Sequence, residues 1–132
     1  MAPELLDPEK FGKTNSRPTK PADVYAFGMV IYEVLTGFDP FYDKNPGTYQ
    51  LVCRVVAGAR PTKPNNAKQI GFGSGTWKLV RECWEEKSKK RPTIERVLAH
   101  LAQFSASSTP HILHPGNYHI PTHLPIVAKL SS

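Results

Sequence analysis

Residues 21–37 read "PADVYAFGMVIYEVLTG", and this stretch decides the fold. Pro21 suits the first turn of a helix, where its missing N–H costs nothing, and Gly37 suits the position just past the C-terminal end. The apolar residues between them fall on every face of a helix rather than on one stripe. Such a helix is typical of the buried axis of an assembly, and about 15 residues that include Asp23 and Glu33 are too few for a membrane span.

Three shorter segments downstream carry apolar residues at the spacing of one helix face. They predict helices over residues 48–57, 76–86 and 93–104. The residues expected on their apolar faces are, in turn, Tyr49, Val52, Cys53 and Val56; Trp77, Val80 and Trp84; and Ile94, Val97, Leu98, Leu101 and Phe104. Residues 58–75 are rich in Gly, Pro and Asn, and we expect them to form a loop.

The two ends of the chain lack this periodicity. Residues 5–20 are polar, with interspersed Pro and Gly, and predict an irregular segment with one helical turn. From residue 105 to residue 132 the composition shifts to Ser, Pro and His, which favours a disordered tail. No segment shows a strand pattern. The sequence therefore predicts an all-α fold over residues 1–104 and a low-order tail over residues 105–132.

The chain is basic, with 17 Lys and Arg against 11 Asp and Glu and a formal net charge of +6. Its densest cationic cluster consists of Lys87, Lys89, Lys90 and Arg91. No aromatic residues alternate with this cluster, so we favour a solvated connection between helices over a nucleic-acid patch.

Cysteine usage and the lack of targeting signals favour an intracellular, cytoplasmic protein. Cys53 and Cys83 both lie in apolar helical patterns, where a free cysteine behaves as a small buried hydrophobic residue. The sequence shows no charged leader with an apolar core and no run of 18 apolar residues. We therefore expect neither a membrane nor a specific nucleic acid as a partner.

Six short elements occur in a set order along the chain. They are Ala2-Pro3-Glu4, Asp23-Val24-Tyr25-Ala26-Phe27-Gly28, Pro40-Phe41, Gly58-Ala59-Arg60-Pro61, Cys83-Trp84 and Arg91-Pro92-Thr93. Their order and spacing resemble the end of a eukaryotic protein kinase domain of the tyrosine-kinase-like branch, for which A-P-E is a signature tripeptide. The resemblance covers residues 1–104. It implies the lower part of the C-terminal lobe, with the end of the activation segment followed by the helices named F, G, H and I.

The resemblance also implies structural roles for three residues. It pairs Glu4 with Arg91 in a bidentate contact that ties the activation segment to the helical base; two independent surface charges are the alternative. It makes Asp23 the helix F aspartate, which in a complete kinase accepts hydrogen bonds from the backbone of the catalytic loop. For this chain we favour a simpler role, in which Asp23 complements the dipole at the N-terminus of its helix.

Phosphoryl transfer by a kinase needs a glycine-rich loop over the phosphates, a strand lysine, a catalytic Asp, and an Asp and an Asn that hold Mg²⁺. The 132 residues contain none of these motifs. We therefore predict no catalytic, cofactor-binding or metal-binding residues in this chain, and ATP and Mg²⁺ belong to the parent family.

Two other patterns suggest ligand sites only weakly. The run Gly71-Phe72-Gly73-Ser74-Gly75 lacks the preceding strand, the spacing and the lysine of a phosphate-binding loop. A metal site built from His111, His114, His119 and His123 is disfavoured, because prolines interrupt the segment and no cysteine accompanies the histidines.

Three interpretations are open. The chain is a fragment of a kinase whose parent transfers the γ-phosphoryl group of ATP to protein Ser/Thr or Tyr, or it is a non-catalytic, pseudokinase-like module that binds protein partners or substrates through the kinase base. The third is an unrelated helical protein that binds nucleic acid. With the upstream elements of the lobe missing, we also expect an exposed flank on the central helix, formed by some of Tyr25, Met29, Tyr32 and Thr36 or by their neighbours. Such a flank would promote self-association.

Overall fold

A computed structural model describes residues 1–41 and 47–107, and every regular element within them is helical. In chain order these are α1 (Pro3–Leu6), the 3₁₀ helix η1 (Glu9–Phe11), α2 (Lys20–Thr36), α3 (Thr48–Val56), α4 (Ser74–Cys83), the 3₁₀ helix η3 (Ser88–Lys90) and α5 (Ile94–Ser107). The all-α prediction is confirmed for this part of the chain. The tail predicted over residues 105–132, with its four histidines, lies outside the described residues from residue 108 onward.

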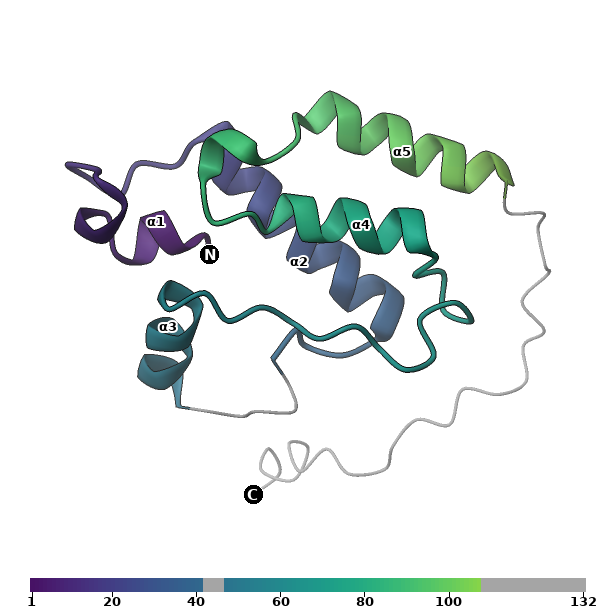
Figure 1. Cartoon of the computed structure of the whole chain (residues 1–132), viewed down its shortest axis with the longest axis horizontal. Helices are drawn as coiled ribbons and strands as arrows, with labels where there is room; N and C mark the ends of the chain where they lie inside the picture. Colours follow the sequence, from purple (N-terminus) through teal and green to yellow (C-terminus); the bar gives the residue numbers. More distant parts are fainter. Residues whose placement is uncertain (42–46, 108–132) are drawn as a thin grey trace, which may run out of the picture.

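The central element is α2, and its two ends form as the sequence predicts (Figure 1). The Thr19 hydroxyl accepts a hydrogen bond from the Ala22 N–H at 3.3 Å and caps the N-terminus, and Pro21 lies in the first turn. Gly37 ends the helix with a φ of 73°, and its N–H donates to the Glu33 carbonyl at 2.7 Å. A glycine is favoured there because side chains disfavour this left-handed conformation.

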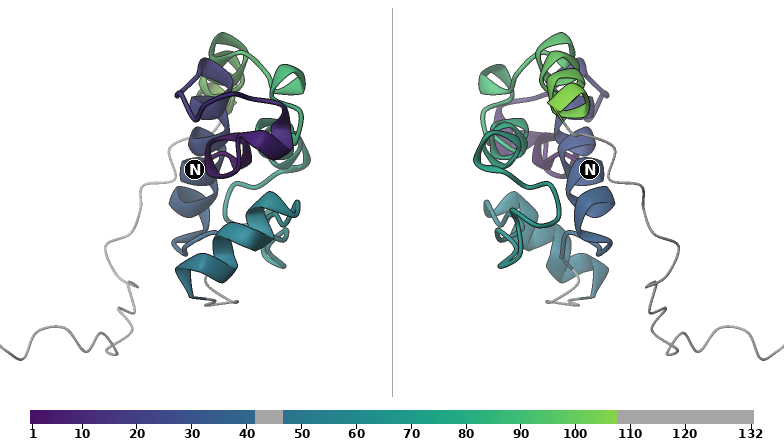
Figure 2. Two further views of the ribbon diagram at one scale, coloured as in Figure 1. Left: turned by 90° about the vertical axis from the view of Figure 1, so that its left-hand side faces the viewer. Right: turned by 90° about the vertical axis from the view of Figure 1, so that its right-hand side faces the viewer.

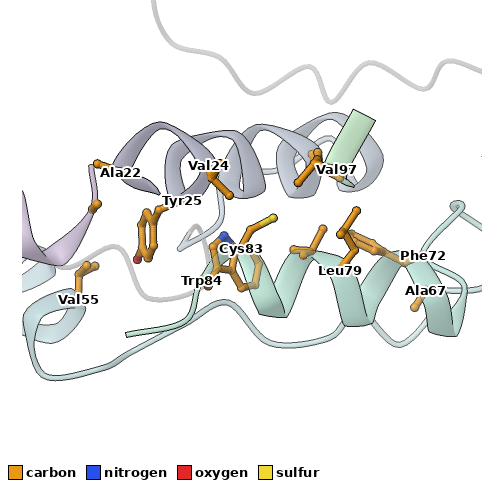
Figure 3. Packing of buried hydrophobic residues seen from close by; sticks show 13 residues of the cluster. Ala22, Val24, Tyr25, Val55, Ala67, Phe72, Leu79, Cys83, Trp84 and Val97 are labelled. Carbon is orange, nitrogen blue, oxygen red and sulfur yellow. The ribbon is translucent and has the colours of Figure 1, made fainter. Parts of the chain in front are cut away.

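The other helices pack around α2 from two directions. α4 lies along α2, whereas α1 contacts α3 (Figures 1 and 2). α5 lies beside α4, and the exposed Arg96–Glu82 ion pair, with an N···O distance of 2.7 Å, joins the two helices. The core between α2 and α4 is formed by Val24, Tyr25, Leu79, Val80, Cys83 and Trp84 (Figure 3).

The long loop between α3 and α4 contributes to this core, which the sequence did not predict. Phe72 is completely buried and Ala67 is nearly so. The Phe72 ring stacks edge-on against Trp77 with centroids 5.4 Å apart, and it also contacts Tyr32 at 5.7 Å. The loop therefore closes one end of the core instead of only crossing the surface.

The apolar face predicted for α3 is only half covered. Of the predicted face, Tyr49 is 80% exposed and Cys53 is exposed, whereas Val52 and Val56 are half-buried; the buried residue of the helix is Val55. The helix carries two overlapping apolar stripes at helical spacing, and only the stripe on the side of α1 is covered. For the same reason the prediction of a buried thiol is confirmed for Cys83 but not for Cys53.

The apolar face predicted for α5 is only partly covered. Val97 is completely buried, but Ile94 is 37% and Leu98 is 54% exposed. α5 packs on the rest of the molecule along a narrow strip of its surface. Val97 lies on that strip, whereas Ile94 and Leu98 lie beside it and remain exposed.

α2 is covered on one side only, and the exposed flank predicted for it is formed by neighbours of the four named residues. Tyr25 is completely buried, and the other three residues named for it are half-buried. The uncovered apolar side chains are instead their neighbours Val30 and Val34, which are 49% and 74% exposed. The uncovered stripe is thus rotated around the helix relative to the expectation.

Candidate functional site

The N-terminal helix is joined to the base of the molecule by a buried ion pair between Glu4 and Arg91. The two Arg91 terminal nitrogens donate to the two Glu4 carboxylate oxygens at 2.6 and 2.8 Å, across 87 residues of sequence. The Arg91 side chain is 0% exposed and that of Glu4 is 6% exposed. Two parallel charge-assisted bonds fix the relative orientation of both groups as well as their distance.

Arg91 also satisfies its remaining donors on backbone carbonyls. Its Nε donates to the Glu85 carbonyl at 2.9 Å, and Nη1 donates to the Pro21 carbonyl at 2.9 Å. One guanidinium therefore links α1, the start of α2 and the segment after α4. Because a buried charge is costly unless it is paired and hydrogen-bonded, this arrangement is what makes its complete burial tolerable.

The ion pair keeps the Glu4 carboxylate charged. Burial alone would raise the pKa of Glu4, but the hydrogen bonds from Arg91 and the positive charges of Arg91 and Lys13 outweigh it, and the pKa is lowered from its ordinary value of 4.5. The contact is therefore present as an ion pair at neutral pH.

Tyr25 of α2 lies between two arginines. The Cζ atoms of Arg60 and Arg91 are 5.2 and 5.1 Å from the centre of its ring. Each arginine therefore makes a cation–π contact with Tyr25. Burial raises the pKa of Tyr25, and the two nearby positive charges partly oppose it. The Tyr25 hydroxyl is buried and has no hydrogen-bond partner within the described residues.

Arg60 holds the loop after α3 against the end of α4. Its Nε donates to the Trp84 carbonyl at 2.9 Å, and its Nη1 donates to the Val55 carbonyl at 3.2 Å. Arg60 and Arg91 thus approach the Tyr25 ring from two separate segments of the chain. We refer to Glu4, Tyr25, Arg60 and Arg91 as the buried junction.

α2 and α4 approach each other closely at Gly28, three residues after Tyr25 of the buried junction. A Cβ atom at this position would lie 2.8 Å from Cys83 Cβ and 2.8 Å from Trp84 Nε1. Only glycine leaves room for the indole here. Burial raises the pKa of Cys83 to about 11, so its thiol is protonated at neutral pH and acts as a packing group rather than a nucleophile.

The opposite side of α2 is uncovered. Asp23, Ala26, Val30 and Val34 are all exposed and follow one another at helical spacing, and we call them the outer face of α2. Asp23 lies in the first turn, where a negative charge complements the helix dipole. Its carboxylate has no hydrogen bond or ion pair with any residue in the ranges that the structure describes.

The described residues hold no metal-binding cluster, and their glycine run is not a phosphate-binding loop. Among them no group of three His, Cys, Asp or Glu residues is placed to hold a metal ion. Gly71 forms a turn and Gly73 precedes the first turn of α4, so this glycine run serves the turn into a helix and follows no strand in the described part. Nor do residues 1–41 and 47–107 contain a helix with the length and apolarity that a bilayer crossing requires.

Sequence reasoning did not predict the roles of Tyr25 and Arg60 in the buried junction. Tyr25 was expected on the exposed flank, and Arg60 occurs in a loop, where no periodicity marks a buried side. The only available signal was the position of Arg60 between Gly58-Ala59 and Pro61, one of the quoted elements.

Comparison with known proteins places this arrangement in context. The pattern of the protein kinase domain family matches residues 1–102. A probable LIM domain-containing serine/threonine-protein kinase of Dictyostelium discoideum is 32% identical over 109 residues, which cover 83% of this chain and 15% of that protein. A putative serine/threonine-protein kinase/receptor of Acanthamoeba polyphaga mimivirus is 35% identical over 100 residues, covering 76% of this chain and 5% of its own length.

A human protein shows the same kind of similarity. The ankyrin repeat and protein kinase domain-containing protein 1 is 34% identical over 88 residues, which cover 66% of this chain and 11% of that protein. The chain thus spans no more than 15% of the length of any of these three relatives.

Proposed function

The chain belongs to the protein kinase domain family, and from this premise we propose that residues 1–104 are the base of a kinase C-terminal lobe, of the tyrosine-kinase-like branch. In this proposal α1 is the end of the activation segment, and α2 to α5 are helices F to I. The role of these residues is to support the phosphoryl transfer of a complete kinase domain to protein Ser/Thr or Tyr. Residues 1–104 bind neither ATP nor Mg²⁺ by themselves.

The observation that carries the proposal is the bidentate pair between Glu4 and Arg91. An activation segment positions a protein substrate only if its end is held in place, and this pair holds the end of α1 against the helical base at two points. The pair is buried and its remaining donors are satisfied, so it acts as a fixed structural connection rather than as a surface contact.

We also propose that, in a complete kinase domain, further elements cover the outer face of α2. Its apolar side chains Val30 and Val34 are uncovered in a helix whose other side is buried, and Asp23 continues the same stripe with an unpaired carboxylate. In a complete domain we expect the catalytic loop to pack here and to donate backbone hydrogen bonds to Asp23. This role replaces the simple dipole interaction that the sequence alone favours.

The experiment that tests the proposal is a pair of measurements on the 132-residue chain. We expect no thermal stabilisation by millimolar Mg·ATP and no transfer of labelled phosphate to a mixture of Ser, Thr and Tyr peptides. A ligand that binds the folded state at a concentration far above its Kd raises the melting temperature by several degrees. Such a shift would contradict the assignment of residues 1–104 as a supporting element.

A further measurement tests the anchoring role directly. In the Arg91→Lys variant one charge remains, but the bidentate geometry is lost. We expect hydrogen exchange to accelerate in α1 while α4 keeps its protection. Equal acceleration in both helices would mean that Arg91 supports the fold generally and does not anchor α1.

A second candidate function is a non-catalytic, pseudokinase-like interaction module, and the exposed apolar side chains favour it. Val34 and Tyr49 are 74% and 80% exposed, on α2 and α3 respectively. In this case the outer face of α2 binds a second copy of the chain. A saturable, concentration-dependent dimer would support this binding of a second copy, whereas a monomer at high concentration would exclude a second copy as the partner.

We place the protein in the cytoplasm, and its two cysteines support this proposal. Cys53 and Cys83 are both free, and the exposed Cys53 would be open to oxidation outside a reducing compartment.

A further inference from the structure

A basic hollow lies beside the buried junction, between η1 and η3. Its volume is about 510 Å³, and five lysines from two distant parts of the sequence line it. Those residues are Lys10, Lys13, Lys87, Lys89 and Lys90. The lysines of the cationic run at residues 87–91 are exposed, as predicted for a solvated connection, and the fold brings two more lysines to them. Its fourth member, Arg91, points inward to the buried junction and does not belong to the hollow.

The positive charge of the hollow is largely unquenched. Two carboxylates also line it, those of Glu4 and Glu86. The Glu4 carboxylate is neutralised by the bidentate contact from Arg91, so only Glu86 opposes the five ammonium groups. Lys10 donates to the Val56 carbonyl at 2.7 Å, which uses one of its three N–H donors and leaves two for a ligand.

From this convergence we propose that the hollow binds a phosphomonoester dianion carried by a peptide. An ammonium group binds phosphate as a compact point charge, and several of them around one concave space suit a dianion better than a single carboxylate. The hollow is larger than a phosphate group, and the half-buried Phe11 ring lines it, so it has room and an apolar wall for the residue that bears the phosphate.

Two other polyanions fit these observations less well. A nucleic acid is bound by basic grooves with successive aromatic platforms, and Phe11 is the only aromatic residue among those lining the hollow. An anionic membrane presents a flat surface, whereas these lysines surround a concavity. The hollow shares only Glu4 with the groups assigned to the proposed kinase role. Because Arg91 neutralises Glu4, phosphate binding by the lysines does not depend on that role.

The test is a titration of the ¹⁵N-labelled 132-residue chain with N-acetyl-phosphoserine amide, with N-acetyl-serine amide as the ligand control. We expect saturable chemical-shift changes confined to residues around the hollow, and none with the unphosphorylated compound. The Lys89→Ala/Lys90→Ala double variant should bind about two- to fivefold more weakly for each lysine removed. Glu86→Gln should bind more tightly, because it removes the opposing charge.

The matched control is the Lys63→Ala/Lys68→Ala double variant, which removes the same charge from two exposed lysines of the loop before α4. We expect it to bind the phosphoserine compound as the unaltered chain does. Equal weakening in both double variants would overturn the proposal, because binding would then follow net charge alone. Tighter, steeply salt-dependent binding to duplex DNA or to phosphatidylserine vesicles would overturn it in favour of those surfaces.

Discussion

The two sides of α2 have similarly apolar sequences but opposite surroundings. On the inner side, Tyr25 is completely buried between two arginines and Gly28 touches the end of α4. On the outer side, Val30 and Val34 are exposed although they are as apolar as their buried neighbours. An apolar sequence on every face of a helix therefore does not by itself mean burial on every face, because in the described residues only the inner side of α2 is covered.

The largest effect on stability is expected from breaking the ion pair of the inner side. Arg91→Met leaves the buried Glu4 carboxylate without a partner and removes the donors to the carbonyls of Pro21 and Glu85. Removing one member of a buried pair typically costs about 3–5 kcal/mol. Urea unfolding followed by circular dichroism measures the change.

Arg96→Met is the matched control, because Arg96 pairs with Glu82 at a similar distance but is 62% exposed. We expect it to cost about 0–1 kcal/mol, since solvent screens an exposed pair. If Arg91→Met leaves no folded protein, Glu4→Gln provides the milder test, because it keeps the shape of the side chain. Similar losses for the two arginines would remove the distinction between a covered and an uncovered contact.

The second effect concerns the packing of the inner side. Gly28→Ala places a methyl group 2.8 Å from Cys83 Cβ and Trp84 Nε1, and these atoms belong to a closely packed interface. Overpacking of this kind costs about 1–3 kcal/mol, measured as a lowered midpoint of urea unfolding. Gly73→Ser is the control, because nothing lies within 4 Å of its Cβ position and serine is favoured at a helix N-terminus. An unchanged midpoint for Gly28→Ala would mean that the indole moves aside easily.

The dependence of stability on pH provides the third effect. The pKa of Glu4 is lowered in the folded protein, so its contribution is present above the ordinary carboxyl value of 4.5 and is lost as the pH falls through the folded value. Glu4→Gln should therefore flatten the loss of stability in acid. The measurement is a series of urea unfolding curves from neutral pH to below pH 4.5.

Glu95→Gln is the comparison for the pH series. Hydrogen bonds from its own backbone and from Thr93 also lower the pKa of Glu95, but that carboxylate is fully exposed. We expect the Glu95 variant to keep most of the acid slope that the Glu4 variant loses. If the two variants behave alike, burial of the Glu4 pair adds nothing to the coupling between protonation and folding.

The sequence predicted the elements better than it predicted their surroundings, for physical reasons. Pro21 and Gly37 act through local backbone geometry, so the ends of α2 could be recognised without knowing the fold. Helical spacing identifies a set of apolar residues but not the neighbour that covers it, which is why Tyr49 of α3 is exposed while Val55 is buried.

Contacts between distant segments had no local signal. No property of residues 1–20 points to Arg91, and the pairing with Glu4 was expected only from the resemblance to protein kinases. The position of Tyr25 between Arg60 and Arg91 depends on three segments meeting, so even the resemblance did not indicate it. The hollow beside the buried junction has the same origin, because Lys10 and Lys13 join the later lysines only in the folded chain.

The smallest effect on stability, and the clearest on association, is expected on the outer side. Val34→Lys should change the free energy of unfolding by less than about 0.5 kcal/mol, because the side chain is 74% exposed and loses no packing. It should nevertheless weaken self-association, since it places a charge at the most exposed apolar position of the uncovered outer face. Sedimentation velocity over a range of protein concentrations measures the self-association.

Asn65→Lys is the control, because it adds the same charge at an exposed loop position away from α2. This variant should associate as the unaltered chain does. If both variants reduce association equally, net charge and not the outer face of α2 controls it, and the uncovered side of the helix has no binding role in this chain.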